Sequence, residues 1–166
     1  MTWSAIVVVG TLSVVALFWI PILLRWRRQP DALVSVSPAQ IESALRQLVE
    51  LRSEDAVIRL DGADDGPDHF EVRFVANQLR FEYQVVHPEQ LQNERRVRSA
   101  FASLGYECME WGDGSFEWDK YIFVELGRDP ATARRRIDDL LRSCAGIAAQ
   151  DVSVKLQDFA KLDLVV

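Results

Sequence analysis

The sequence predicts an α+β domain that follows one N-terminal transmembrane helix. The domain is expected to be a mostly antiparallel sheet with helices on one face, in the order α-β-β-β-α-β-β-α-β. Three observations support this prediction. First, residues 3–24 contain no charged side chain. Second, in the rest of the chain, segments whose apolar residues recur at helical spacing follow segments in which apolar and polar residues alternate. Third, clusters of Gly, Pro and Asp separate these segments.

The first stretch, Trp3 to Leu24, has the length of a membrane-spanning helix. At about 1.5 Å rise per residue it covers roughly 33 Å, which matches the roughly 30 Å hydrocarbon core of a bilayer. Arginines follow it directly, and tryptophans stand where indole rings favour the headgroup region. The predicted anchor residues are Trp3, Trp19, Arg25, Trp26, Arg27 and Arg28.

A cleaved signal peptide is the alternative for this stretch. It would require positive charge before a shorter apolar run and a small-x-small site after it. Met1 and Thr2 carry no side-chain charge, and arginines follow the run instead of small residues. A retained anchor is therefore favoured. The arginines on its C-terminal side predict an outside N-terminus and a cytoplasmic location for everything from Arg25 onward.

The predicted organisation is an anchor with its basic flank (1–28), a tether (29–36) and one α+β domain (37–166). After residue 30 the chain has 25 acidic and 16 basic side chains, a net charge of −9. Such a domain repels nucleic acid, so the expected partners are a protein at the membrane and the lipid bilayer. Cys108 and Cys144 form no CxxC pair and are predicted to be buried small hydrophobes in a reducing compartment.

The domain is predicted to open with a helix over 37–52. Residues 37–40, Ser-Pro-Ala-Gln, have the N-cap, the N1 proline and the N3 glutamine of a capping box, and apolar residues recur behind them at helical spacing. Three alternating runs then predict strands near 56–60, 70–74 and 79–85. Their other face is mostly polar, as in a three-strand antiparallel meander with one wet face. The acidic loop 61–68 and the turn 76–78 connect them.

A second helix is predicted to end at Gly105, with a start between Pro88 and Asn93. Next comes a hairpin, in which 106–111 and 115–126 flank the turn Gly-Asp-Gly at 112–114. The third helix is expected to start at Asp129-Pro130 and to stop at Gly146. A last alternating run over 152–156 is predicted to add an edge strand.

Two passages resemble parts of the bacterial YbjN and TY-Chap domains. These are the helix-to-hairpin passage 95–118, with Leu104-Gly105-Tyr106 at its turn, and the helix 131–147, which ends in Gly146-Ile147. The resemblance implies a fold similar to that of the type III secretion chaperones, a chaperone-like binding role with no catalytic residues, a bacterial source and homodimer formation. The known chaperones are soluble, whereas this chain has a predicted anchor.

The sequence predicts no catalytic, cofactor-binding or metal-binding residues, and the chain is not expected to be an enzyme. The acidic loop 61–68 lacks the spacing and the closing glutamate of a calcium loop. Its Asp, Gly and Pro residues are typical of a solvated hairpin loop. His69 and His87 lie at element boundaries with no nucleophile motif around them.

Aromatic residues around the predicted hairpin form a candidate protein-contact patch. Successive side chains of a strand point to opposite faces, and these aromatics stand at even positions up to residue 118 and at odd positions from residue 121. One pair of them is therefore expected to face away from the core, unless a bulge intervenes. Exposed aromatics are enriched in interface hot spots. The alternative is that they fill the core under the helices. The candidates are Trp111, Phe116, Trp118, Tyr121 and Phe123.

These observations predict a membrane-anchored, non-catalytic protein-binding module, chaperone-like or adaptor, that acts at the cytoplasmic face of the bacterial inner membrane. The alternative is a small accessory subunit of a larger membrane complex, which assembles through its transmembrane helix.

Overall fold

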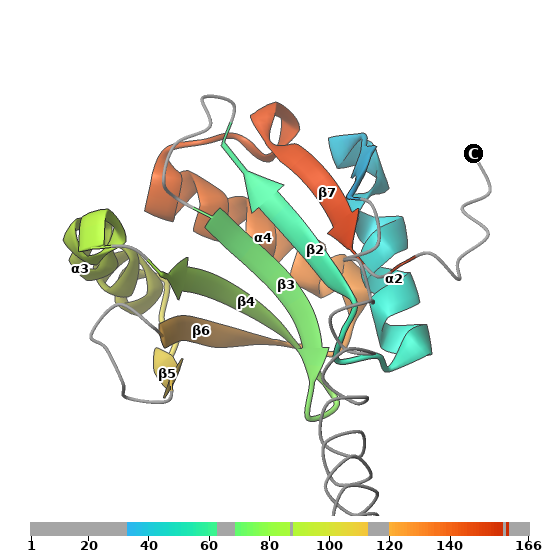
Figure 1. The fold of residues 1–166 in the computed structure, drawn as a ribbon, viewed down its shortest axis with the longest axis horizontal. Helices are drawn as coiled ribbons and strands as arrows, with labels where there is room; N and C mark the ends of the chain where they lie inside the picture. The colour runs from blue at the N-terminus through green and yellow to red at the C-terminus, as the bar shows by residue number, and fades with distance from the viewer. Residues whose placement is uncertain (1–32, 63–68, 87, 113–119, 158, 160–166) are drawn as a thin grey trace, which may run out of the picture. The chain divides into compact units, whose positions relative to one another are not determined.

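The domain is a layer of helices packed on one face of a seven-stranded antiparallel sheet (Figure 1). The computed structural model describes residues 33–62, 69–86, 88–112, 120–157 and 159. Within them it contains three α-helices, and the α+β prediction is confirmed. No helix in this part of the chain is long and apolar enough to cross a membrane. The predicted anchor, residues 3–24, lies outside the described residues.

The elements follow the predicted order, with one extra strand at the start. The helices are α2 (Ile41–Leu51), α3 (Pro88–Ser103) and α4 (Pro130–Ala145), with 3-10 turns η1 (Pro38–Gln40) and η2 (Ala149–Asp151). The strands are β1 (Val34–Val36), β2 (Val57–Asp61), β3 (His69–Val75), β4 (Gln78–Val85), β5 (Met109–Gly112), β6 (Lys120–Gly127) and β7 (Ser153–Gln157).

The strand order in the sheet is β1-β7-β2-β3-β4-β6-β5, and every pairing is antiparallel. Two expectations were wrong here. The last residues of the expected tether form β1, whose Val34 pairs with Leu156 of β7. Strand β7 therefore has a neighbour on each side and is not an edge strand. A three-residue strand is too short to show alternation, which is why the sequence did not indicate it.

Helix boundaries follow the predicted capping chemistry. The Ser37 hydroxyl accepts from the Ala39 N–H at 3.4 Å, and the Gln40 side chain accepts from the Ser37 N–H at 2.9 Å. Helix α3 begins at Pro88, the earlier of the two predicted starts. After it, Gly105 takes φ +78°, and its N–H and that of the next residue bond back to the last turn at 3.0 Å each.

Helix α4 begins and ends where the sequence predicts. The Asp129 carboxylate accepts from the Thr132 N–H at 2.8 Å, and Gly146 ends the helix in the left-handed conformation. Since local chemistry fixes both ends, the bounds of this helix could be predicted from the sequence.

The core lies between the helices and one face of the sheet. Alternate residues of β2, β3, β4, β6 and β7 point into it, and its largest fully buried side chains are Tyr83, Phe70, Phe81 and Phe101. Phe70 and Phe81 stack with ring centroids 5.2 Å apart. Figure 1 shows α4 behind β2 and β3, with α2 next to it at the right. The opposite face of the sheet, called the open face below, carries no described helix.

The turn between β3 and β4 is a two-residue hairpin without glycine. Ala76 and Asn77 both have positive φ, 49° and 67°. This combination matches the type I′ turn, whose twist suits the flanking strands. An alanine in this conformation is strained. The other two predicted turns, 63–68 of the acidic loop and 113–114 of the hairpin, lie outside the described residues.

Candidate functional site

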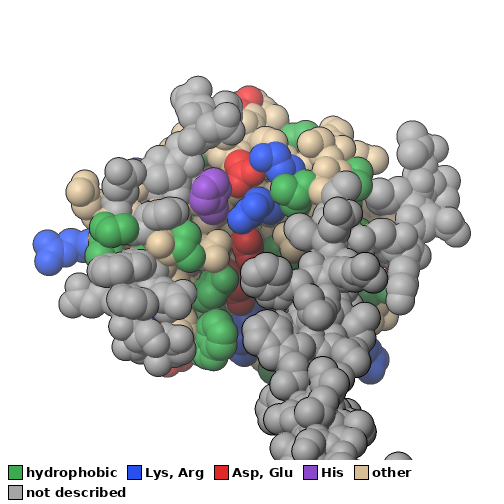
Figure 2. All heavy atoms as spheres, in the orientation of Figure 1, with side chains coloured by type: hydrophobic (Ala, Val, Ile, Leu, Met, Phe, Trp, Pro, Cys, Tyr) green, Lys and Arg blue, Asp and Glu red, His purple; other side chains and the backbone are tan. Residues whose placement is uncertain are grey.

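The open face consists of the strand residues that alternate with the core residues, and many of them are charged. Arginines and glutamates occupy neighbouring positions across β2, β3, β4 and β6. The charged residues on this face are Lys155, Arg59, Asp61, His69, Glu71, Arg73, Arg80, Glu82 and Glu125. Figure 2 shows acidic and basic side chains alternating through the middle of this face, with hydrophobic side chains beside them.

The centre of the open face is a ladder of ion pairs. Glu71 lies 3.5 Å from Arg59 Nη2, and it accepts from Arg73 Nη2 at 2.7 Å and from Arg73 Nε at 3.1 Å. Arg73 Nε also lies 3.3 Å from a carboxylate oxygen of Glu82. Arg80 Nη2 is 3.6 Å from Glu125. Opposite charges are direct partners between β2 and β3, Arg59 with Glu71, and between β4 and β6, Arg80 with Glu125, which favours these two pairings. Between β3 and β4 the direct partners carry like charges, Glu71 with Glu82 and Arg73 with Arg80, and the ion pair of Arg73 with Glu82 is diagonal.

A second polar group lies on β2, β3 and β7. Asp61 is buried, and its two oxygens lie 2.9 Å from His69 Nδ1 and 2.8 Å from Lys155 Nζ. Burial disfavours the charged form of this carboxyl, but the hydrogen bonds from Lys155 and His69 outweigh burial and hold its pKa below the usual value. Asp61 is therefore an ionised structural carboxylate.

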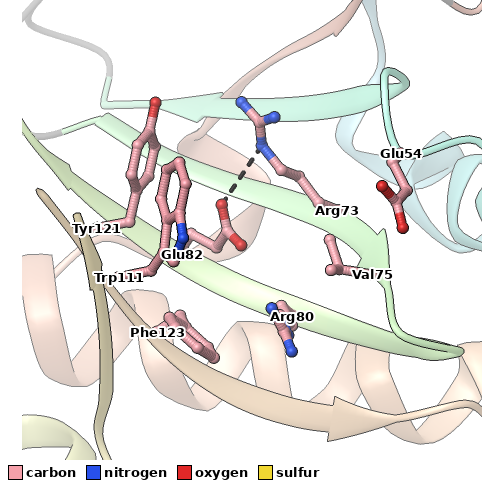
Figure 3. A pocket seen from close by; sticks show the side chains of 8 residues that line it. All are labelled: Glu54, Arg73, Val75, Arg80, Glu82, Trp111, Tyr121 and Phe123. Atoms are coloured by element: carbon pink, nitrogen blue, oxygen red, sulfur yellow. Dashed lines mark ion pairs between the residues drawn. The ribbon is translucent and has the colours of Figure 1, made fainter. Parts of the chain in front are cut away.

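A pocket opens at the other end of the ladder, next to β5. Its volume is about 360 Å³. Figure 3 shows Trp111 and Tyr121 along one side, Arg73 and Val75 opposite, and the Glu82 carboxylate in the centre pointing toward Arg73. The lining residues come from four strands and one connection: Glu54, Arg73, Val75, Arg80, Glu82, Trp111, Tyr121 and Phe123. We call this site the aromatic pocket.

Two guanidinium groups in the aromatic pocket lie over aromatic rings. The carbon of the Arg80 guanidinium is 4.5 Å from the centroid of the Phe123 ring, and that of Arg73 is 5.8 Å from the centroid of Tyr121. Trp111 and Tyr121 lie with ring centroids 5.8 Å apart. These stacked contacts position the arginines, because a flat guanidinium is attracted to the face of an aromatic ring.

Glu82 is the buried carboxyl of the aromatic pocket. Only 7% of the residue is exposed. Burial raises its pKa to about 7, because the low-dielectric surroundings disfavour the anion and the nearby Glu71 repels it, while Arg73 and Arg80 oppose the shift. At neutral pH this carboxyl is therefore divided between its charged and neutral forms.

The structure brings together three of the five predicted contact residues. Trp111, Tyr121 and Phe123 all lie on the open face, because Trp111 pairs with Tyr121 and Met109 with Phe123 in the register of β5 and β6. Phe123 is 7% exposed but is not part of the core under the helices, and Trp111 is 67% exposed. The alternative that these aromatics fill that core is wrong for the three. Phe116 and Trp118 lie outside the described residues.

Arg73, Arg80 and Glu82 were not predicted as site residues. Their alternation marked them as wet-face residues of a meander, a pattern that says nothing about which strand lies next to β4. Strand β6 pairs with β4 across a long stretch of sequence and so brings Tyr121 opposite Gln84 and Phe123 opposite Glu82. The one sequence pattern that pointed to these residues is the recurrence of arginines and glutamates on the polar face of successive predicted strands.

The remaining predicted features are structural. Cys144 is buried as expected, whereas Cys108 is half-buried and accepts from Arg98 at 3.4 Å. His69 binds Asp61, as described above, and His87 lies outside the described residues. In the described part of the chain, no group of three or more His, Cys, Asp or Glu residues is placed to hold a metal ion.

Comparison with known proteins gives no further assignment. No protein family model, curated protein or solved structure matches this chain.

Proposed function

We propose that this chain is a membrane-anchored, non-catalytic protein-binding module, chaperone-like or adaptor, at the cytoplasmic face of a bacterial inner membrane. The open face of its sheet would be the binding surface. One observation carries this proposal: the described helices cover only one face of the sheet, and the other face has an exposed tryptophan beside an aromatic-lined pocket.

The composition of the aromatic pocket supports protein binding. Trp, Tyr and Arg are the residues most enriched in interface hot spots, and Trp111, Tyr121, Arg73 and Arg80 lie around one hollow. Trp111 is the most exposed large hydrophobic residue in the described part of the chain, at 67%. A partner that covers this indole would remove a large apolar area from water.

The sequence supports the membrane part of the proposal. The uncharged stretch 3–24 and the arginines after it predict an anchor that holds the domain in the cytoplasm next to the bilayer. Anchoring raises the local concentration of the domain and so favours partners that are themselves in or at the membrane. The resemblance to YbjN and TY-Chap domains points to the same class of function.

Affinity capture from native membranes in mild detergent tests the proposal. The baits are the full-length chain, a version that starts at Gln29, and full-length Trp111→Ala. The control bait is Leu104→Ala, which removes a hydrophobic side chain that is 40% exposed and does not line the aromatic pocket. We expect the first two baits and the control to return the same protein, and Trp111→Ala to lose at least about tenfold of it.

The same experiment distinguishes the alternative function, an accessory subunit that assembles through its transmembrane helix. In that case the partner returns only with the intact anchor, and Trp111→Ala captures it as well as the unaltered chain does. Enlarging the small anchor residues Gly10 or Ser13 would then abolish capture.

A further inference from the structure

Arg80 has more hydrogen-bonding capacity than its surroundings satisfy. Its guanidinium is held over Phe123 and lies 3.6 Å from Glu125, within ion-pair range but too far for a hydrogen bond. Its Nε is buried, and no described residue accepts a hydrogen bond from it. A guanidinium has five N–H donors in a planar fork that matches a carboxylate. Arg80 therefore lacks an acceptor on a wall of the aromatic pocket.

The other groups of the aromatic pocket suit an acceptor that is attached to an apolar body. Trp111, Tyr121 and Val75 form the apolar sides, and the pocket of about 360 Å³ has room for a side chain. A small, fully hydrated anion would leave these surfaces in contact with water. A carboxylate carried on a side chain would fill the hollow and displace that water.

Of the two arginines that line the aromatic pocket, Arg80 is the one that no described carboxylate holds by a hydrogen bond. Arg73 is held by two hydrogen bonds to Glu71, whereas the ion pair of Arg80 with Glu125, at 3.6 Å, is too long for a hydrogen bond. Glu82, the third carboxyl of the group, is buried, and no described residue donates a hydrogen bond to it. Glu54, at the rim, is exposed. Arg80 is therefore the arginine of the aromatic pocket that can bind the carboxylate of a ligand.

We infer that the aromatic pocket binds an acidic side chain, flanked by apolar residues, from an extended segment of the protein partner, and that Arg80 binds its carboxylate. This inference rests on the proposed protein-binding function and specifies what the partner presents. Trp111 and Tyr121 contact the apolar flank of the segment.

The inference predicts that Glu82 changes its protonation when the ligand binds. A carboxylate that binds beside Glu82 repels its anion, so Glu82 takes up a proton on binding. The charged groups around Glu82 are Glu71 and Arg73 from β3 and Arg80 from its own strand. Glu54, from the connection between α2 and β2, lines the same pocket, Glu125 of β6 lies opposite Arg80, and Tyr121 lies next to Glu82. A cationic ligand in the same place would release a proton instead. The sign of the exchange therefore reports the charge of the ligand.

Fluorine NMR of the full-length chain in mild detergent tests the inference. Tryptophan is replaced by 5-fluorotryptophan, and the Trp111 resonance is assigned by its loss in Trp111→Phe. The probes are the capped peptide acetyl-Leu-Glu-Phe-amide, its neutral counterpart acetyl-Leu-Gln-Phe-amide, and 3-phenylpropionate. We expect the Glu peptide to shift the Trp111 resonance at a concentration at least about tenfold below that of the Gln peptide. Calorimetry in two buffers should show proton uptake near pH 7.

The matched variants are Arg80→Gln and Arg59→Gln. Both arginines lie on the open face, both pair with a glutamate at 3.5 to 3.6 Å, and both have a buried Nε without a partner, but only Arg80 lines the aromatic pocket. Arg80→Gln should weaken binding of the Glu peptide about tenfold, and Arg59→Gln should leave it unchanged. If Arg80→Gln does not fold, as judged by near-ultraviolet circular dichroism, Arg80→Lys serves instead, since it keeps the charge and loses the fork.

Several results would overturn the inference: equal affinity for the Glu and Gln peptides, an equal effect of both arginine variants, proton release on binding, or no shift of Trp111 with any probe. Tighter binding of 3-phenylpropionate than of the Glu peptide would also overturn it, because the site would then be one for a free carboxylic acid. These failures leave the proposed function standing if Trp111→Ala still loses the captured partner. If Trp111→Ala captured the partner as well as the unaltered chain does, the proposed function itself would be overturned.

Discussion

Glu82 illustrates how one buried side chain makes the stability of a sheet depend on pH. Its pKa is about 7 in the folded protein and 4.5 in the unfolded chain. Between these values the folded state binds more protons than the unfolded state, so the free energy of unfolding falls as pH rises through this range. The opposite holds for Asp61, whose lowered pKa stabilises the fold above its unfolded value of 3.8 and ceases to do so at lower pH.

We therefore predict that Glu82→Gln flattens the pH dependence of stability. In the unaltered chain, ionisation of Glu82 should lower the free energy of unfolding by up to about 3 kcal/mol between pH 5 and pH 8. The amide cannot ionise, so the variant should lose most of that slope. Denaturant unfolding of the full-length chain in mild detergent, followed by near-ultraviolet circular dichroism, measures both curves. Glu125→Gln, a more exposed carboxyl on the same face, is the control and should keep the slope; identical slopes for Glu82→Gln and the unaltered chain would contradict the prediction.

Replacing the turn residue Ala76 by glycine is predicted to stabilise the folded domain. Its positive φ of 49° places the alanine Cβ in a strained position that glycine avoids. Ala76→Gly should raise the free energy of unfolding by about 1 kcal/mol and raise the Tm. The same substitution at Ala131, an exposed position within α4, should lower stability by up to about 1 kcal/mol, because glycine costs conformational entropy in a helix. Changes of the same sign at both positions in thermal unfolding would show that the turn is unstrained.

At the scale of the elements, an ion-pair network connects β5 to helix α3. It is a four-residue edge strand, and three of its four residues are exposed. Arg98 of α3 forms ion pairs with Glu94 on its own helix, at 2.8 Å, and with Glu110 of β5. Lys120 of β6 adds a contact to Glu94 at 3.1 Å. This network ties the end of the sheet, and with it Trp111, to the helix layer.

Removing the Arg98 contact should loosen β5 without unfolding the domain. We expect Arg98→Met, which keeps an apolar stem, to speed amide hydrogen exchange in Met109–Gly112 about fivefold. Exchange in β4 should not change, because that strand has neighbours on both sides. Hydrogen-exchange mass spectrometry measures both strands in one sample. Arg46→Met removes a comparable pair within α2, to Glu42 at 2.6 Å, and should leave β5 as it was. Faster exchange throughout the sheet would mean that Arg98 supports the whole domain.

The elements were predictable where their signals are local. Capping residues, a glycine after each of two helices and alternation of period two placed three helices and six strands near their observed positions. The sequence could not indicate β1 or the place of β7 in the sheet, because both depend on pairing between distant residues. For the same reason it could suggest Trp111, Tyr121 and Phe123 but not the arginines and the glutamate that face them.

For the whole molecule, the anchor prediction has a direct test. We expect the full-length chain to stay in the membrane fraction after alkaline carbonate washing, and a version that starts at Gln29 to be released from it. A C-terminal fusion to a fluorescent protein that matures only in the cytoplasm should be bright, and a fusion to a phosphatase that is active only outside should be inactive. Replacing Arg25, Arg27 and Arg28 by alanine should reduce this bias of orientation. An active phosphatase fusion in the unaltered chain would reverse the predicted topology.

The pairing of β1 with β7 also determines when this domain can finish folding. Val34 pairs with Leu156 in the sheet, so the first of the described strands can take its place only after the last of them has been made. Such non-local contacts slow folding, because a long loop must be closed before they form. The strands that carry the aromatic pocket are all synthesised earlier, by Gly127. The strands of the surface proposed for binding are thus made before β7, the strand that completes the described sheet.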